Sequence, residues 1–266
     1  MEGRRCVHIS LVIHTIVKDG LVVGSDTRTT CQGDKGEVRY KDTTVKIFPF
    51  PNRIVVTHTG DANVTDTLSV VEFLTKFRKK CGNKTTITEL PTKLLNAYVS
   101  ETGNRQRNTE FKVAGYDTEN LSEGRVYTVK CQDRTIVLSK RPFEYGAYLG
   151  GTVDVAYAML NGVSYSTLSL EEAIELTKTV IETNIAIYKY RANQIIGGNA
   201  ELYVVDRINE RSGWFKAGEI LPDKLAPDDG LEKYLEQKEK RMVNYSATSN
   251  RASCFNDHSY YHVSQM

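Results

Sequence analysis

The hydrophobic pattern changes its period several times along the chain, and each change predicts a different kind of element. Residues 7–17 and 21–30 are rich in Val, Ile and Leu, as β-strands are, and Lys18-Asp19-Gly20 supplies a turn between them. An Asp-Gly pair between two such runs is typical of a β-hairpin. A second strand pair is predicted at 45–48 and 53–57, interrupted by prolines.

Helical periodicity replaces the strand pattern after residue 60. Apolar side chains recur at spacings of three and four over about 61–80 and again over about 88–103, which predicts a pair of amphipathic helices. Short β-prone runs separated by turn residues follow at 111–116, 125–129 and 135–138. These runs predict three further strands.

A second pair of helices is predicted at 150–162 and 170–190. The later helix opens with the capping-box sequence Ser169-Leu170-Glu171-Glu172, and its acidic residues precede its basic ones, as the helix dipole favours. Strands at 201–205 and 213–216 follow it. Because the strands are joined as hairpins rather than by helical crossovers, the order predicts an α+β fold with mainly antiparallel sheets covered by helix pairs. Two sheets stacked between helical layers is one economical arrangement.

The composition and charge narrow the choice of partners. The chain has 266 residues with 40% hydrophobic and 26% charged residues, which is typical of a globular protein, and its formal net charge is +2. This balance gives no reason to expect binding to nucleic acid or to an acidic membrane. No run approaches 18 apolar residues, and the N-terminus lacks the apolar core of a signal peptide, so we expect a cytoplasmic protein.

The cysteines and the C-terminal region carry little chemistry by themselves. The five cysteines are scattered, with no C-x-x-C pair, so reduced thiols are expected and neither a metal nor a cofactor is predicted.

Residues 1–222 are expected to form one domain. Residues 223–266 are expected to form a charged arm followed by a disordered tail, because charged and polar residues dominate there.

Four blocks of the sequence resemble β-type subunits of the proteasome and their bacterial relatives, and they occur in the order found in that family. The blocks are Gly20-Leu21-Val22-Val23-Gly24-Ser25-Asp26-Thr27-Arg28; Val45-Lys46-Ile47-Phe48-Pro49 with Thr59-Gly60-Asp61; Tyr148-Leu149-Gly150-Gly151; and Tyr190-Arg191 with Gly197-Gly198. The resemblance covers roughly residues 7–220. It implies an N-terminal nucleophile (Ntn) hydrolase fold, a four-layer αββα sandwich of two mainly antiparallel sheets.

The resemblance also implies a catalytic group. Members of this family use their first mature residue as the nucleophile and its α-amine as the base. A buried lysine and an aspartate assist them, and Lys46 and Asp26 match those positions. The nucleophile of the family lies sixteen residues before the aspartate, which is Ser10 here, so residues 1–9 would be a propeptide. Arg28 is expected to support the site.

Other positions match or depart from the family pattern. The backbone N–H near Gly60 is expected to stabilise an oxyanion, and His58 matches a position that lines the substrate pocket. Gly151 stands where the family has a serine that supports the nucleophile. Asn193 stands near the position of a second aspartate and lacks its charge. Ile9 precedes Ser10 where self-cleaving relatives usually have glycine.

Three functions are compatible with these residues. The first is a proteasome-type peptidase that becomes active when Ser10 is exposed. The second is a non-catalytic β-type subunit of a homo- or hetero-oligomeric ring. The third is an N-terminal cysteine amidohydrolase that uses Cys6 after loss of residues 1–5. The resemblance implies ring partners, a peptide or protein substrate and, for a complete protease, an ATPase partner.

Overall fold

The computed structural model describes residues 5–8, 10–32, 38–82, 84–103, 107–116, 124–139, 145–191 and 194–222. Within these residues the chain forms two antiparallel β-sheets and four α-helices. The predicted tail at 223–266 and residue Asn193 lie outside the described residues.

The first sheet, sheet A, has the strand order β10-β9-β8-β7-β1-β4-β5, with β6 also paired to β7. Its strands are β1 (Arg5–His8), β4 (Thr29–Gln32), β5 (Val38–Lys41), β6 (Ile47–Phe50), β7 (Ile54–Asp61), β8 (Thr109–Tyr116), β9 (Gly124–Lys130) and β10 (Thr135–Leu138). A short 3-10 turn, Pro51–Arg53, joins β6 to β7. The N-terminal strand β1 therefore lies inside the sheet, between β7 and β4.

The second sheet, sheet B, has the order β11-β2-β3-β12-β13-β14. Its strands are β2 (Leu11–Val17), β3 (Gly20–Asp26), β11 (Gly146–Gly151), β12 (Ala200–Asp206), β13 (Arg211–Lys216) and β14 (Glu219–Pro222). The strand pairs of this sheet are antiparallel. The predicted β2–β3 hairpin is present, with Val17 paired to Gly20 across the turn.

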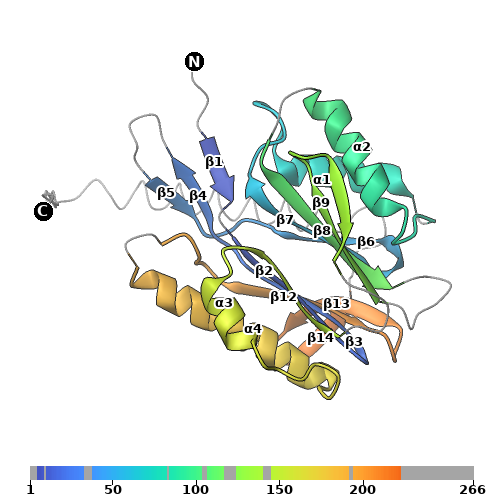
Figure 1. Cartoon of the computed structure of the whole chain (residues 1–266), viewed down its shortest axis with the longest axis vertical. Helices are drawn as coiled ribbons and strands as arrows, with labels where there is room; N and C mark the ends of the chain where they lie inside the picture. Colours follow the sequence, from blue (N-terminus) through green and yellow to red (C-terminus); the bar gives the residue numbers. More distant parts are fainter. Residues whose placement is uncertain are drawn as a thin grey trace, which may run out of the picture.

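The two sheets stack face to face, and helix pairs cover their outer faces (Figure 1). Helices α1 (Val70–Cys81) and α2 (Leu90–Thr102) pack on sheet A, and α3 (Asp154–Leu160) and α4 (Leu170–Lys189) pack on sheet B. Separate apolar clusters fill the space between the sheets and the two spaces between sheet and helices. This is the predicted α+β, four-layer αββα sandwich.

Two of the predicted strands are wrong in one respect, because each is divided between the sheets. Residues 7–17 contribute β1 to sheet A and β2 to sheet B, and the chain crosses from one sheet to the other at Ser10. Residues 21–30 likewise divide into β3 and β4, with the crossing at residues 27–28. Strands β2 and β3 are buried on both faces, so no alternation of polar residues marks where one strand ends and the next begins.

Two helices are shorter than predicted, and α3 spans Asp154–Leu160 rather than 150–162 because Gly150 and Gly151 belong to β11. Helix α1 begins at Val70 rather than near residue 61, because Ser69 and Glu72 form a capping box there. Strands β5, β11 and β14 were not predicted, whereas Pro49, expected to interrupt a strand, lies within β6. Strand β6 pairs only with β7, so the missing N–H of a proline is tolerated on its other edge.

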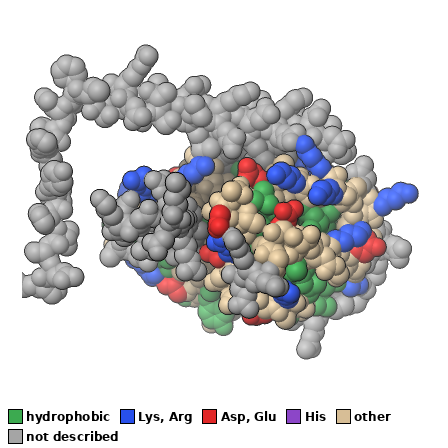
Figure 2. All heavy atoms as spheres, turned by 90° about the horizontal axis from the view of Figure 1, so that it is seen from above, with side chains coloured by type: hydrophobic (Ala, Val, Ile, Leu, Met, Phe, Trp, Pro, Cys, Tyr) green, Lys and Arg blue, Asp and Glu red, His purple; other side chains and the backbone are tan. Residues whose placement is uncertain are grey.

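The charged side chains on one face of the molecule are mixed in sign. On the face shown in Figure 2, the Lys and Arg side chains are interspersed with Asp and Glu among the coloured, described residues rather than gathered by sign. None of the helices in the described part of the chain is both long and apolar enough to cross a membrane.

Candidate functional site

An ion pair between Lys46 and Asp26 occupies the interior next to the point where the chain crosses between the sheets. The Nζ atom of Lys46 lies 2.7 Å from Oδ1 of Asp26, and both side chains are fully buried. Burial lowers the pKa of Lys46, and the Asp26 carboxylate counteracts part of this effect. The high cost of an unpartnered buried charge predicts this pairing, and the structure brings the two residues together.

Asp26 is held by hydrogen bonds from three backbone segments as well as by Lys46. Its Oδ1 atom accepts from the N–H of Leu11 at 3.0 Å, and its Oδ2 atom accepts from the N–H groups of Arg28 at 3.2 Å and Gly197 at 3.1 Å. Each carboxylate oxygen thus has two donors. One carboxylate therefore connects Lys46 to the residue immediately after Ser10 and to the loop before β12.

Ser10 lies at this crossing, with its side chain fully buried. Its Oγ atom has no hydrogen-bond partner among the described residues. Its carbonyl oxygen accepts a hydrogen bond from Thr152 N at 2.8 Å. The hydroxyls of Ser25 on β3 and Thr30 on β4 are also buried without a partner among the described residues, so this feature is shared by three positions near the crossing between the sheets.

Gly151 lies directly against Ser10. It has φ +85°, and a Cβ atom built on it would come within 1.7 Å of the Ser10 carbonyl oxygen. The serine that the family carries at this position would therefore be strained and would clash with backbone. Glycine at this position allows the backbone of β11 to lie in close contact with the backbone of Ser10.

Gly60 and His58 lie on β7. Gly60 is paired with His8 of β1 and has φ +94°, and a Cβ on it would meet the Asn108 carbonyl oxygen at 1.9 Å. His58 is fully buried, with Nε2 3.4 Å from the Val45 carbonyl oxygen. Burial, with a smaller contribution from Lys46, lowers the pKa of His58 to about 3, so its ring is neutral at pH 7.

Arg28 connects the site to the loop that precedes β12. Its guanidinium makes a bidentate ion pair with Asp42, at 2.6 and 2.8 Å, and donates to the Gln194 carbonyl oxygen at 2.9 Å. A Cβ atom on Gly197 would lie 2.3 Å from the Arg28 Cζ atom, so a larger residue here would have to displace the guanidinium from its present position. Because Gly197 N–H binds Asp26, Arg28 supports the ion pair indirectly.

A second buried polar group, between the sheets, was not identified from the sequence. His14 lies on β2 four residues after Ser10, and its Nε2 atom is 3.3 Å from Thr57 Oγ1. The Nζ atom of Lys112, on β8, donates to Thr128 Oγ1 at 2.9 Å and lies 3.3 Å from Glu110 Oε1. Burial, and then the charge of Lys112, lowers the pKa of His14 to about 3. No local pattern marked His14, because every residue of β2 is buried.

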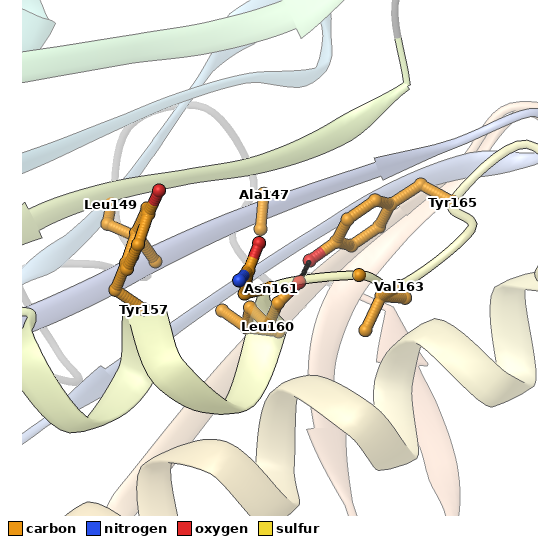
Figure 3. A pocket seen from close by; sticks show the side chains of 8 residues that line it. Ala147, Leu149, Tyr157, Leu160, Asn161, Val163 and Tyr165 are labelled. Carbon is orange, nitrogen blue, oxygen red and sulfur yellow. Dashed lines mark hydrogen bonds between the residues drawn. The ribbon is translucent and has the colours of Figure 1, made fainter.

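A cavity of about 260 Å³ lies elsewhere, on the helix-covered side of sheet B (Figure 3). Leu149 and Ala147 of β11, Tyr157 and Leu160 of α3, and the loop after α3 line it. Tyr165 Oη donates to the Leu160 carbonyl oxygen at one side. None of the predicted site residues lines this cavity. Among the described residues, no group of three or more His, Cys, Asp or Glu side chains is arranged to hold a metal ion.

Comparison with known proteins gives one family and one fold. The sequence model of the proteasome family, described as "Proteasome subunit", matches residues 13–204. A search of curated proteins finds no match.

Several solved structures share the fold at low sequence identity. Anbu in a helical assembly from Pseudomonas aeruginosa has a TM-score of 0.59 and 15% identity, over 88% of this chain and 96% of that one. A Gly-1 mutant of Anbu from Hyphomicrobium sp. strain MC1 has a TM-score of 0.57 and 14% identity, over 94% of this chain and 100% of that one. Anbu from Yersinia bercovieri, described as an ancestral beta-subunit, has a TM-score of 0.56 and 15% identity, over 93% of this chain and 99% of that one.

Proposed function

Since this chain belongs to the proteasome subunit family, we propose that it is a proteasome-type subunit that hydrolyses peptide bonds with Ser10 once the Ile9–Ser10 bond is cut. The observation that carries the proposal is the hydrogen bond from the N–H of Leu11, the residue after Ser10, to the Asp26 carboxylate of the buried Asp26–Lys46 pair. The uncut chain is then an inactive subunit.

The chemistry follows from what cleavage would create at Ser10. A new α-amine has an ordinary pKa of about 7.7–8.0, so a useful fraction is neutral at pH 7 and can accept the proton of the Ser10 hydroxyl. The hydroxyl then attacks the substrate carbonyl, and the amine returns the proton to the leaving group. The Lys46 ammonium provides positive potential in a water-poor interior, where charge acts strongly. The backbone N–H near Gly60 is proposed to stabilise the oxyanion.

Removal of residues 1–9 would also vacate a place in sheet A. Strand β1 pairs with β4 through residues 30–32 and with β7 through residues 60–61. An extended peptide can bind between such strands by the same backbone hydrogen bonds, with its scissile bond near Ser10. His58 is proposed to line the pocket for a substrate side chain, since it lies on β7 close to Lys46.

A non-catalytic ring subunit is the second candidate, and specific observations favour it for the uncut chain. Ser10 is inaccessible in the full-length structure, and the serine that would support it is replaced by Gly151. The alternative nucleophile Cys6 has less support, because Asp26 binds the amide of Leu11, next to Ser10, whereas Cys6 lies within β1.

The partners proposed for either candidate are further ring subunits. One of the Anbu structures of this fold is described as a helical assembly, which makes self-association a natural expectation here. An ATPase partner and a cytoplasmic location complete the proposal, the latter because the scattered cysteines suit a reducing compartment.

The test compares chains that differ only at the N-terminus and at Ser10. A chain whose first residue after processing is Ser10 is assayed on fluorogenic peptides beside its Ser10→Ala counterpart and the full-length chain. We expect turnover only in the first, and covalent labelling of Ser10 by an inhibitor that bridges a hydroxyl and an α-amine. Intact mass of the purified full-length chain reports whether residues 1–9 are lost.

The possible outcomes separate the hypotheses. Equal turnover of the chain that begins at Ser10 and of its Ser10→Ala counterpart would remove Ser10 from the mechanism. Neither turnover nor a covalent adduct, in a chain that assembles, would leave the non-catalytic subunit. Loss of residues 1–5 alone would favour Cys6.

A further inference from the structure

Two cysteines that lie far apart in the sequence occupy directly opposite positions on neighbouring strands. Cys6 of β1 and Cys31 of β4 are paired in the antiparallel register, between the pairs Arg5–Gln32 and Val7–Thr30. Directly paired residues of antiparallel strands share a face of the sheet, and their Cα atoms lie about 4.5–5.5 Å apart. Disulfides usually join residues whose Cα atoms are about 4.4–6.8 Å apart. The register therefore satisfies the main geometric requirement for a bond between them.

We propose that Cys6 and Cys31 form an oxidation-dependent disulfide that fastens the N-terminal strand β1 to β4. The oxidant is a small-molecule disulfide such as oxidised glutathione. The thiolate of one cysteine attacks it, forming a mixed disulfide and releasing one glutathione thiol. The second cysteine then attacks the protein-side sulfur, which forms the Cys6–Cys31 bond and releases the second thiol. The protein loses two protons and two electrons, which reduce one glutathione disulfide to two thiols.

The other described cysteines are less suited to this reaction. Burial raises the pKa of the Cys81 thiol to about 11 and raises that of Cys131 further, which lowers the fraction of reactive thiolate at each. Cys131 is also buried, whereas Cys31 is half-buried and lies on the strand next to the exposed β5. Among the described strand pairs, neither Cys81, at the end of α1, nor Cys131, just after β9, lies opposite another cysteine.

The bond would act on the proposed site because of where β1 lies. Strand β1 occupies the place between β4 and β7 and leads directly into Ser10. In an oxidised chain, residues 1–9 would stay attached even after cleavage at Ile9–Ser10, and reduction would release them. This consequence rests on the proposed function, but formation of the bond does not.

The experiment uses the full-length chain, reduced and then incubated with oxidised glutathione, blocked with a thiol reagent and digested with trypsin. Tryptic cleavage places Cys6 in peptide 6–18 and Cys31 in peptide 29–35. We expect these two peptides to be joined in the oxidised sample and separate after reduction. The joined product should be lost in Cys6→Ser and Cys31→Ser chains and retained in Cys81→Ser, the matched control.

Other results would overturn the proposal. Glutathione adducts on Cys6 and Cys31 without a joined peptide, or bonding of either one to a different cysteine, would show that the pair does not close. If the joined peptide forms while a chain that begins at Ser10 has no turnover, the disulfide stands and the proposed peptidase function fails. If the chain that begins at Ser10 hydrolyses the peptides but no joined peptide forms, the proposed peptidase function stands and the disulfide fails.

Discussion

At the scale of single residues, the Lys46 ammonium depends on Asp26 because both charges are fully buried. Replacing Lys46 with Met would leave the Asp26 carboxylate buried without its cation, and removing one partner of a buried pair costs about 3–5 kcal/mol. We expect urea unfolding of Lys46→Met to show a loss of this order. Lys93→Met is the matched control, since Lys93 forms an exposed pair with Glu89, and its unfolding midpoint should barely change. Equal losses in the two variants would contradict the buried pairing.

A serine at Gly151 would destabilise the fold in two ways, through the positive φ and through a clash with Ser10, and two substitutions can separate them. Gly151→Ser must adopt φ +85° and must also displace the Ser10 carbonyl oxygen. Gly162→Ser has nearly the same φ, +84°, with nothing within 4 Å of the added Cβ, so it reports the conformational strain alone, about 1–3 kcal/mol. We expect Gly151→Ser to destabilise the chain clearly more in thermal or urea unfolding. A Gly151→Ser chain as stable as Gly162→Ser would mean that the close contact with Ser10 is relieved easily.

Two buried histidines predict a loss of stability in mild acid. The pKa of His14 and of His58 is about 3 in the folded chain against an ordinary value of 6.5, so between these values the unfolded chain binds more protons. Stability from each histidine is therefore present above about pH 6.5 and falls as the pH drops toward 3. At pH 5 the loss is about 2 kcal/mol for each histidine.

The measurement is urea unfolding at pH 7.5 and pH 5. The decrease between the two pH values should be smaller by about 2 kcal/mol in His14→Gln than in the unchanged chain. His14 faces Thr57 and Lys112, and Lys112 in turn forms an ion pair with Glu110. An identical decrease in His14→Gln would show that His14 is not the neutral, buried group inferred here.

At the scale of elements, periodicity predicted the helices and most strands but not where the chain changes sheets. Helix α4 was predicted nearly to its limits, because its capping box and apolar stripe are local signals. The division of residues 7–17 at Ser10 leaves no such signal, since β2 is buried on both faces. Strand β5, exposed along its length, has no buried face, and no strand was predicted there.

The position of β1 leads to a prediction that hydrogen exchange can check. In the full-length chain β1 pairs with Thr30 of β4 and with Gly60 and Asp61 of β7. A chain that begins at Ser10 loses these pairings, so peptides covering residues 29–32 and 58–61 should exchange faster. Peptides from β9, which is separated from β1 by β7 and β8, are the internal control and should not change. Unchanged exchange at Thr30 and Gly60 would mean that β1 does not protect the sheet.

The candidate site itself was only partly predictable, because its parts meet through tertiary structure. Asp26 and Lys46 were identified by resemblance to a family and by the cost of unpaired charge, and the structure brings them together. The contribution of Gly197, whose N–H binds Asp26, required the fold, since 171 residues separate the two. The cluster of His14, Thr57 and Lys112 forms only when two sheets face each other, which no local pattern specifies.

At the scale of the whole molecule, the outer layer of α3 and α4 leads to a prediction about assembly. Tyr157 of α3 is 64% exposed, and Tyr190 at the end of α4 is 87% exposed. Asp154 of α3 binds Tyr188 and Arg191, which joins the start of α3 to the end of α4. Large exposed side chains on one layer favour contact with another subunit, because aromatic residues are enriched at protein interfaces.

We therefore expect the full-length chain to self-associate through this layer at micromolar concentration. Light scattering should give a mass above that of one chain, and Tyr190→Glu should shift the mass toward the monomer, because a charge at a buried contact is costly. Ile208→Glu is the matched control: Ile208 is 59% exposed in the turn between β12 and β13, outside α3 and α4. It should leave the mass unchanged. A monomer for the unchanged chain would contradict a ring subunit, and an equal shift in both variants would place the contact elsewhere than the α3–α4 layer.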